Sequence, residues 1–385
     1  MIYLDSNATT QVAPVVLDAM LPYLRECYAN PSASYRSARK VKSAVETARQ
    51  QVATLIGAER TEEVMFTSCG TESINAVHAS VRSLWPDRPG LIITGTEHSA
   101  VIESAKRWRE SGGRVEVVPV CPSGRVDLAA LEKALASGDV GLVSIMWANN
   151  ETGVIAPMRE IVQMAHAVGA LVHSDAVQAV GKIAVNVQDV PVDFLSLSGH
   201  KIHAPKGIGG LYVSRKVRFR ALLVGGGQEM NRRSGTENVA GIVALGAAAL
   251  LAMDGHGNCE LRDRFEEQIL ASIKNVRVWG DQENRLPNTS CLSLLGVDAA
   301  GLLILLDKAG VCCSAGSACH TASLHPSHVL EAMGVSVVDA ASMLRFSFSR
   351  FNSIEDVDTA ADALIRSVKK LRVLNDESAG PVAFS

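Results

Sequence analysis

The chain has 385 residues, of which 47% are hydrophobic and 20% are charged, and its formal net charge is −3. This composition is typical of a folded protein with a large core, and the weak charge gives no indication of a nucleic acid or an anionic membrane as partner. No apolar run reaches the ~18 residues of a membrane span. The opening MIYLDSNATT lacks the basic start and apolar run of a secretory signal. We therefore expect a cytoplasmic protein and, at this length, two domains.

The eight cysteines are scattered along the chain, and no two of them form a CxxC pair. This pattern fits neither a zinc site nor the disulfide framework of a secreted protein. It indicates a reducing compartment, in which most cysteines are small buried residues and at least one is a candidate nucleophile.

Short apolar runs alternate with helical patterns through the middle of the chain. The runs predict strands at residues 63–68, 90–95, 115–120, 140–146, 170–176 and 193–198, and helices are predicted between them, for example at 100–110 and 158–168. Strands that alternate with helices predict a largely parallel sheet with helices on both faces. In such sheets ligands gather at the carboxyl ends of the strands.

After about residue 250 this alternation ends. A charged amphipathic helix, CELRDRFEEQILASIKN, precedes strands near residues 276–279 and 288–294, and a final helix runs from 353 to about 371. The pattern predicts a smaller α+β domain. We expect an N-terminal segment (1–15) that packs on the small domain, a large domain (16–250) and the small C-terminal domain (251–385).

The turn TSCGTES after the first predicted strand is a candidate phosphate site. It places Gly70 and Thr71 at a helix N-terminus, where free backbone N–H groups and a hydroxyl suit an anion. The turn is not a Walker A sequence, and many strand-to-helix turns of this kind bind nothing.

Polar residues follow three further predicted strands. Asp175 either caps the next helix or faces a buried cation such as a pyridinium nitrogen, and Gln178 lies one helical turn later. His98 is either a hydrogen-bonded core residue or a ring that stacks on an aromatic cofactor. Asn149 and Asn150 either form a turn or hydrogen-bond a ring oxygen.

The stretch SGHKIHAPKG places Lys201 directly after a predicted core strand, beside Ser198 and His200. Burying an ammonium is costly, but a desolvated lysine loses its proton readily and can form a Schiff base with a carbonyl. Lys206, in the Pro/Gly-rich loop, fits a solvated surface lysine better. A phosphate turn, a stacking histidine, a strand-end aspartate and a lysine are together typical of a pyridoxal 5'-phosphate site.

The segment SAGSACHTASLHPSHV (314–329) places Cys319 among small and polar residues, which indicates an exposed loop. His320, His325 and His328 either favour its thiolate or are solvated loop residues. We expect no metal site here, because no carboxylate lies among these histidines.

Arg345 alternates with apolar residues in MLRFSFS, a predicted strand of the small domain. A buried arginine needs an anionic partner. A substrate carboxylate would serve as this anionic partner.

Motifs in eight places resemble those of group I cysteine desulfurases, the NifS/IscS type. The resemblance rests on the whole set of motifs and not on any one segment. They occur in the family's order between Tyr3 and Arg350: YLDSNATT, FTSCGTESIN, EHSAV, ANNETGV, HSDAVQAVGK, SGHKIHAPKGIG, GGGQEMNRRSGTEN and GSACHTASLHPSHVLEAMG. The resemblance implies an α/β fold type I transferase dependent on pyridoxal phosphate, with a mostly parallel seven-stranded-type sheet in its large domain and a smaller α+β domain.

The resemblance also implies roles for individual residues. Lys201, Cys319 and His98 would be catalytic, with Cys319 accepting sulfur from L-cysteine as a persulfide while alanine is released. Asn30, Asn150 and Arg345 would bind the substrate. The cofactor would be held by Gly70, Thr71, His98, Asn150, Asp175, Gln178, Ser198, His200, Lys201 and Thr236. Thr236 would reach the phosphate of the other subunit of a homodimer, and the persulfide would pass to an acceptor or scaffold protein.

The sequence departs from the family in the region that receives the substrate. Ser6 replaces the first of two asparagines that usually open the motif, and Tyr35 and Arg36 stand where many members carry a histidine. ACHT and RLPNT are also similar to selenocysteine lyases, so that activity is one alternative. A class V aminotransferase, which would not need Cys319, is another. A non-catalytic scaffold would be indicated by loss of the lysine or the strand-end aspartate, and both are present.

Overall fold

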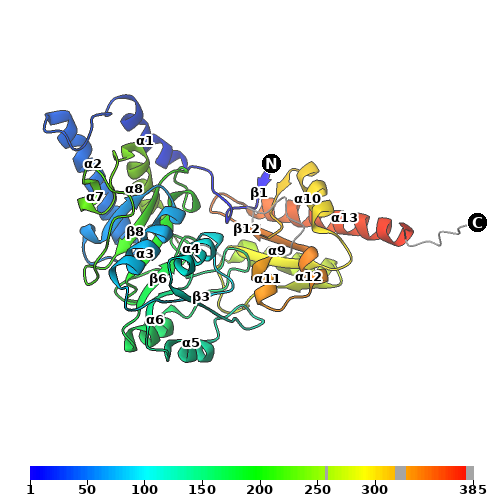
Figure 1. The fold of residues 1–385 in the computed structure, drawn as a ribbon. Coiled ribbons are helices and arrows are strands. Elements are labelled where there is room, and N and C mark those ends of the chain that lie inside the picture. The colour runs from blue at the N-terminus through cyan, green and yellow to red at the C-terminus, as the bar shows by residue number, and fades with distance from the viewer. Residues whose placement is uncertain (256–258, 317–326, 379–385) are drawn as a thin grey trace, which may run out of the picture.

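The computed structural model describes residues 1–255, 259–316 and 327–378, which form two lobes of different size (Figure 1). The large lobe is built on a seven-stranded sheet. Its strand order is β2 (Val64–Thr67), β8 (Gly209–Val213), β7 (Phe194–Ser198), β6 (Leu171–Asp175), β5 (Val140–Ser144), β3 (Gly90–Thr94) and β4 (Arg114–Val118). All six strands predicted in this region are present, with bounds within two residues of those expected.

The sheet is parallel from β7 to β4, and β8 runs antiparallel to both of its neighbours, β2 and β7. β8 was not predicted from the sequence, because GGLYV begins with two glycines, which are unusual inside a strand. The first of them is required by packing. A Cβ on Gly209 would lie 2.9 Å from the Cα of Cys69, in the turn that follows β2.

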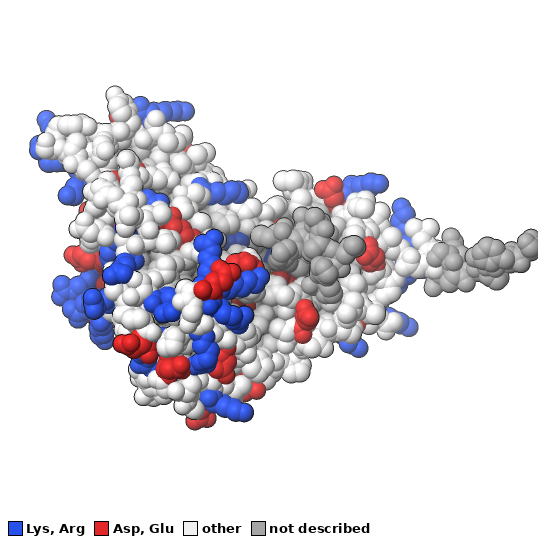
Figure 2. All heavy atoms as spheres, viewed as in Figure 1, with Lys and Arg blue, Asp and Glu red and all other residues white. Residues whose placement is uncertain are grey.

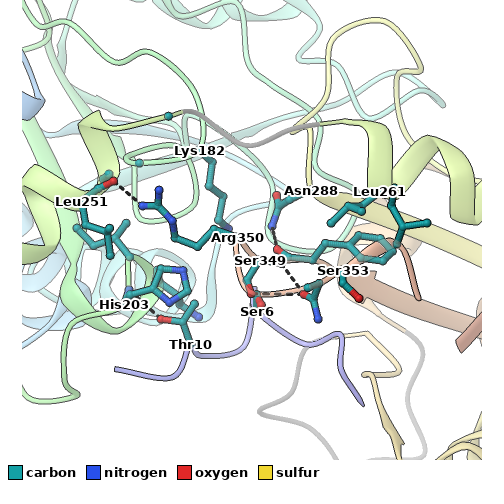
Figure 3. Close-up of a pocket in the computed structure, with 18 residues that line it drawn as sticks. Ser6, Thr10, Lys182, His203, Leu251, Leu261, Asn288, Ser349, Arg350 and Ser353 are labelled. Atoms are coloured by element: carbon teal, nitrogen blue, oxygen red, sulfur yellow. Dashed lines mark hydrogen bonds between the residues drawn. The ribbon is translucent and has the colours of Figure 1, made fainter. Parts of the chain in front are cut away.

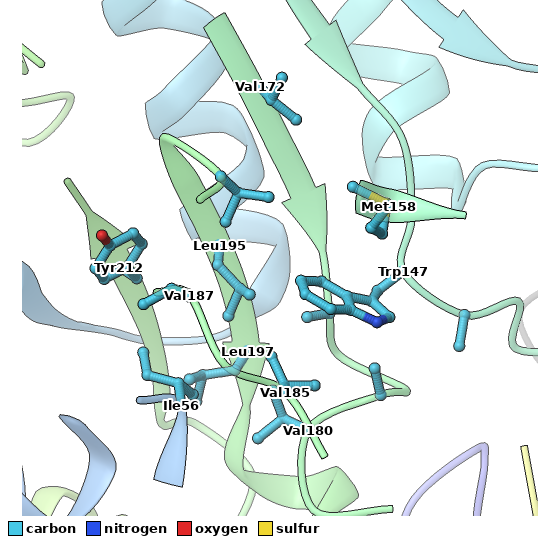
Figure 4. Packing of buried hydrophobic residues seen from close by; sticks show 14 of the residues in the cluster. Ile56, Trp147, Met158, Val172, Val180, Val185, Val187, Leu195, Leu197 and Tyr212 are labelled. Atoms are coloured by element: carbon cyan, nitrogen blue, oxygen red, sulfur yellow. The ribbon is translucent and has the colours of Figure 1, made fainter. Parts of the chain in front are cut away.

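Alternate side chains of each strand enter two different cores. Met65, Leu91 and Leu142 pack on one face of the sheet with α3 (Gly70–Leu84) and α4 (Ser99–Glu110). The opposite face includes Leu195 and Leu197 of β7, which lie in one cluster with Trp147 and Ile56 (Figure 4). This second core is covered by α1 (Pro14–Arg25), α2 (Arg36–Leu55), α5 (Leu128–Leu135), α6 (Met158–Ala167) and α8 (Val239–Met253).

The small lobe contains an antiparallel sheet of β12 (Met343–Ser347), β10 (Thr289–Leu294) and β9 (Val276–Val278). Its helices are α9 (Glu260–Ser272), α10 (Ala299–Lys308), α11 (His328–Ala332), α12 (Val337–Ala341) and α13 (Ile354–Ser378). The first strand of the chain, β1 (Ile2–Tyr3), pairs in parallel with β11 (Val311–Cys312) and so belongs to this lobe. The exact domain boundaries drawn from the sequence stay a prediction.

Residues 5–10, which we call the N-terminal strap, connect the two lobes. The backbone N–H of Asn7 donates to Ser347 Oγ (2.9 Å) and its Nδ2 donates to Thr289 Oγ1 (2.9 Å), both in the small lobe. Its backbone oxygen accepts from Gln178 Nε2 (2.9 Å) in the large lobe. The strap therefore fixes the two sheets relative to each other.

On the face seen in Figure 2, basic and acidic side chains are interspersed over the large lobe and do not separate by sign. Within the described ranges, no helix combines the length and the apolar character that a membrane span requires.

A buried ion pair joins α2 to the short helix α7 (Gln228–Asn231). Arg49 Nη1 lies 2.6 Å from Glu229 Oε2, and both side chains are at most 4% exposed. Glu229 Oε2 also accepts from the backbone N–H of Phe66 in β2 (2.8 Å). The Glu229 carboxylate thus holds a helix and a strand of the large lobe together.

Changing Glu229 to glutamine should lower the free energy of unfolding by about 2–3 kcal/mol, because it leaves the buried Arg49 guanidinium without its main counter-charge. Glu46 also contacts Arg49 (3.2 Å), but its side chain is 53% exposed. The matched variant Glu46→Gln should therefore cost less than about 1 kcal/mol. Urea denaturation of both variants is the measurement, and equal losses would contradict the special role of Glu229.

Candidate active site

A cavity of about 280 Å³ lies at the edge of the large sheet where β2, β6 and β7 end, and it is bounded by the N-terminal strap and the small lobe. Ten of the residues predicted from the sequence line it: Gly70, Thr71, His98, Asn150, Asp175, Gln178, Ser198, His200, Lys201 and Arg345. Residues from six separate segments of the chain therefore meet in one place, as the rule for ligands at strand ends predicts.

Lys201 reaches this cavity from a 3-10 turn (Gly199–Lys201) that directly follows β7. Its Nζ donates to the backbone oxygens of Asn7 (2.5 Å) and Ala8 (2.7 Å) in the strap. Lys206 lies in the loop beyond and is exposed. The two lysines of the stretch thus have the different environments that the sequence indicated.

Asp175, at the end of β6, and His98, in the turn between β3 and α4, line the cavity together with Lys201. Asp175 is buried and its Oδ1 accepts from the backbone N–H of Val177 (3.0 Å). Burial raises the pKa of its carboxyl, while the neighbouring His98 and Lys201 act in the opposite direction. A cation placed against Asp175 would offset the cost of burying this carboxylate.

The imidazole of His98 caps α4, because its Nδ1 accepts from the backbone N–H of Ala100 (3.1 Å). Burial lowers the pKa of His98, against the effect of Asp175, so the ring is neutral at pH 7. With Nδ1 acting as acceptor, the single ring proton is assigned to Nε2.

The opposite end of the cavity is suited to a phosphate. Cys69 makes no side-chain cap at the start of α3, which leaves the first N–H groups of this helix for another acceptor. Ser198 Oγ is buried and has no hydrogen-bond partner among the described residues. A Cβ on Gly70 would lie 2.8 Å from Val177 Cγ2, so a larger residue here would displace the Val177 side chain. Burial beside Lys201 lowers the pKa of His200 to about 4, so its ring is neutral and can donate.

Arg345 in β12 lines the same cavity, but its charge is already paired. Its Nη2 lies 2.7 Å from Asp5 Oδ1, and its Nη1 donates to the backbone oxygen of Asn150 (3.1 Å). The sequence indicated a substrate carboxylate as the anionic partner of Arg345 and did not indicate Asp5. The Nε of Arg345 is buried without a partner in the described part of the chain, so this guanidinium still has a donor to offer.

Two predicted site residues, Asn30 and Thr236, do not line the cavity. Asn30 is exposed and its Oδ1 accepts from the backbone N–H of Ser32 (2.9 Å). Thr236 is also exposed, in the segment before α8. Cys319 lies outside the described residues, as do His320 and His325. The roles of all these residues stay predictions.

The structure adds residues that the sequence analysis did not assign to the site. Asn7 contacts Lys201, Gln178 and Lys182, and the only signal for it was its place in the motif YLDSNATT. His328, considered earlier only beside Cys319, lines the cavity and its Nε2 lies 2.9 Å from the backbone oxygen of Glu97. Asn149 is a turn former, because its Oδ1 accepts from the N–H groups that follow it.

Glu97 is fully buried behind the cavity. Its carboxylate accepts from Thr94 Oγ1 (2.7 Å) and from the backbone N–H of Met146 (3.0 Å). Burial, helped by the nearby Asp175 carboxylate, outweighs these hydrogen bonds and raises the pKa of Glu97 to about 8. The folded protein therefore keeps a proton on Glu97 that the unfolded chain loses.

This proton makes stability depend on pH. Between the ordinary glutamate pKa of about 4.5 and about 8, the folded state binds the proton more tightly, so the free energy of unfolding should fall as pH rises. Glu97→Gln cannot lose a proton and should reduce this fall by at least about 1 kcal/mol. Denaturant unfolding from about pH 5 to about pH 8 checks it, with Glu103→Gln as the control because Glu103 is 65% exposed. Identical slopes for wild type and Glu97→Gln would disprove the assignment.

The fold and this lysine-bearing cavity define a class of protein. The aminotransferase class-V family model matches residues 2–359, and the chain belongs to that family. The mixed α/β architecture with a mostly parallel central sheet is that of fold type I pyridoxal phosphate enzymes, which confirms the predicted fold class.

Individual relatives show which kind of enzyme within this family the chain is similar to. The chain is 47% identical over 378 residues to "Cysteine desulfurase 2" of Trichormus variabilis, covering 97% of this chain and 94% of the relative. It is 43% identical over 376 residues to "Cysteine desulfurase NifS" of Azotobacter vinelandii, covering 96% and 93%. Among solved structures, a NifS-like protein superposes with a TM-score of 0.89 at 36% identity over 96% of this chain and 99% of that one. A structure described as SspA in complex with cysteine gives 0.79 at 30% identity, over 92% and 100%. These relatives confirm the resemblance to the NifS/IscS type.

Proposed function

We propose that this protein is a pyridoxal phosphate-dependent cysteine desulfurase, which converts L-cysteine to L-alanine and keeps the sulfur as a persulfide on Cys319. The observation that carries the proposal is the meeting of Lys201, Asp175, His98 and the orphaned Ser198 hydroxyl in one cavity. The names of the relatives support the same activity.

The cavity residues fit the cofactor from end to end. Lys201 would attach it covalently, Asp175 would pair with the pyridinium nitrogen and His98 would stack on the ring. Ser198, His200 and the N-terminus of α3 with Gly70 and Thr71 would hold the phosphate, and Gln178 and Asn150 would contact the ring oxygen or the substrate. When bound, pyridoxal phosphate withdraws electrons from the substrate and weakens the bonds around its α and β carbons.

The side chains of the protein would bind the substrate, move protons and accept the sulfur. Arg345, with Asn150 and Asn30, would bind the substrate carboxylate and orient the cysteine. The Lys201 amine and the neutral His98 ring would move protons. The Cys319 thiolate would attack the substrate sulfur, so that a sulfur–sulfur bond forms while the carbon–sulfur bond breaks and the carbon takes its electron pair and a proton. The products are alanine and a persulfide on Cys319, to be passed to an acceptor protein for iron–sulfur clusters or another thiolation.

We also propose that the active form is a homodimer in which Thr236 reaches the phosphate site of the partner subunit. Leu222, Leu223 and Val224 lie in the segment before Thr236 and are exposed, with Val224 at 84%. A group of exposed large apolar side chains favours burial against a second copy.

The test is a comparison of wild type with Cys319→Ala on two substrates. Alanine release from cysteine should be lost in this variant, because no thiolate remains to accept the sulfur, while release from selenocysteine persists. Cys121→Ala is the matched control, since Cys121 is exposed and lies outside the cavity. Alanine from selenocysteine alone in the wild type would make this protein a selenocysteine lyase. Turnover that needs a keto acid and survives in Cys319→Ala would make it an aminotransferase.

A further inference from the structure

A second cavity, of about 410 Å³, is lined by Lys201 and by Ser6 and Thr10 of the N-terminal strap. Figure 3 shows its lining residues. We call it the rear cavity. Ser6 and Thr10 of the strap line it, whereas Asn7 and Ala8 line the active-site cavity, and Lys201 borders both. The strap therefore separates the two cavities, and the proposed desulfurase chemistry uses only the active-site cavity.

The described lining of the rear cavity carries positive charge and no carboxylate. Lys182 and Arg350 lie together in Figure 3, and no Asp or Glu is among the lining residues. Lys182 is only 8% exposed, and its Nζ donates to two neutral oxygens, Asn7 Oδ1 (2.7 Å) and Gln178 Oε1. Within the described ranges neither Lys182 nor Arg350 forms an ion pair with a carboxylate. An ammonium has three N–H groups, so Lys182 has one more to donate.

A buried cation without a counter-charge is unfavourable. Burial, together with the charges of Lys201 and Arg345, lowers the pKa of Lys182 well below its ordinary value. An anion in the rear cavity would reverse this effect, because an opposite charge stabilises the ammonium.

A polar atom of the strap also points to a ligand. Ser6 is 2% exposed and lines the rear cavity, yet its Oγ has no hydrogen-bond partner among the described residues. Buried hydroxyls of native proteins nearly always have a partner. The remainder of the lining mixes polar residues, among them Asn288 and Asn352, with apolar side chains, among them Leu251, Leu261 and Phe348.

We propose that the rear cavity binds a small aliphatic carboxylate. Lys182, Arg350 and the Ser6 hydroxyl hold the carboxylate, and its short hydrocarbon chain packs against Leu251, Leu261 and Phe348. The volume suits a small organic molecule, and polar groups that converge beside apolar side chains are typical of such sites. Because Lys201 Nζ is held by the backbone of the strap, a ligand behind the strap is positioned to influence this lysine.

Butyrate is the probe, and butyramide is its neutral analogue. Binding to the full-length protein saturated with pyridoxal phosphate is measured by saturation-transfer NMR and calorimetry without cysteine, so the result does not depend on the proposed reaction. Wild type should bind butyrate but not butyramide. Arg350→Gln should bind it about tenfold more weakly, since a charge-assisted hydrogen bond is lost. The control Arg366→Gln, at an exposed position of α13 outside the cavity, should bind it like wild type.

Ser6→Ala is a second variant that leaves the charges in place and should weaken binding about threefold through loss of one hydrogen bond. Circular dichroism of each variant verifies its fold. Absence of butyrate binding to wild type would overturn the proposal, as would equal binding of butyrate and butyramide. Binding that is unchanged in both Arg350→Gln and Ser6→Ala but lost in Arg345→Gln would place the carboxylate in the active-site cavity and would overturn it too.

Discussion

Replacing Lys201 with alanine should lower the rate of alanine release from cysteine at least about 10⁴-fold, because in the proposed mechanism the amine serves both as covalent anchor and as proton carrier. Within the described residues, Lys201 is the one lysine that lines the active-site cavity, so no neighbour can take over. The visible absorption of the covalently attached cofactor should disappear as well. Alanine release and the absorption spectrum of the purified variant are the measurements.

Lys206→Ala is the matched control. Lys206 is exposed and lies outside the cavity, so its loss should change turnover by no more than about twofold. If Lys201→Ala retained a tenth of the wild-type rate, or if both variants lost activity equally, the central role assigned to Lys201 would be wrong.

Asp175→Asn should lower kcat by about 10³-fold, the size of effect expected when a preorganised charge is removed from a dry active site. The amide keeps the size of the side chain and can still accept from the backbone N–H of Val177, so the turn after β6 should persist. What is lost is the negative charge that would keep the ring nitrogen protonated. Steady-state kinetics measure the effect, and thermal unfolding checks the fold.

The alternative for Asp175 is a simple helix cap, and Asp127 provides the comparison. Asp127 caps α5 through a hydrogen bond from the backbone N–H of Ala130 (3.0 Å). It does not line the active-site cavity. Asp127→Asn should leave kcat within about twofold of wild type. If Asp175→Asn behaved in the same way, Asp175 would be no more than a cap.

The strands that carry the site could be predicted because each is a short apolar run bounded by turn residues, as in FLSLS before Lys201. β8 could not, since GGLYV begins with two glycines, the first of which packs closely on the Cys69 turn, and has too few apolar residues to show a period. The hydrogen-bonded series of buried side chains His78, Ser144 and His173 also could not be predicted from the sequence. Its members come from three elements and are hydrogen-bonded only after the sheet has formed.

The site was predictable where one residue follows one strand, as with Asp175 and Lys201. The site was not predictable where two residues far apart in the sequence form an ion pair or a hydrogen bond with each other. The sequence shows that Arg345 needs an anion, but not that Asp5 supplies it from 340 positions away. Side-chain pairs of this kind depend on the register of strands that pair only in the complete fold, and no local pattern encodes them.

The N-terminal strap has a consequence for synthesis on the ribosome. Asn7 emerges 282 residues before Thr289 and 340 residues before Ser347, its partners in the small lobe. Domains generally fold as units during synthesis, so the large sheet can assemble while these partners are still absent. The carbonyls that hold Lys201 are fixed only after β12 has left the exit tunnel. A nascent or prematurely terminated chain thus has its lysine and its strand ends in place but an active-site cavity without one wall, and the enzyme matures only when the strap meets β10 and β12.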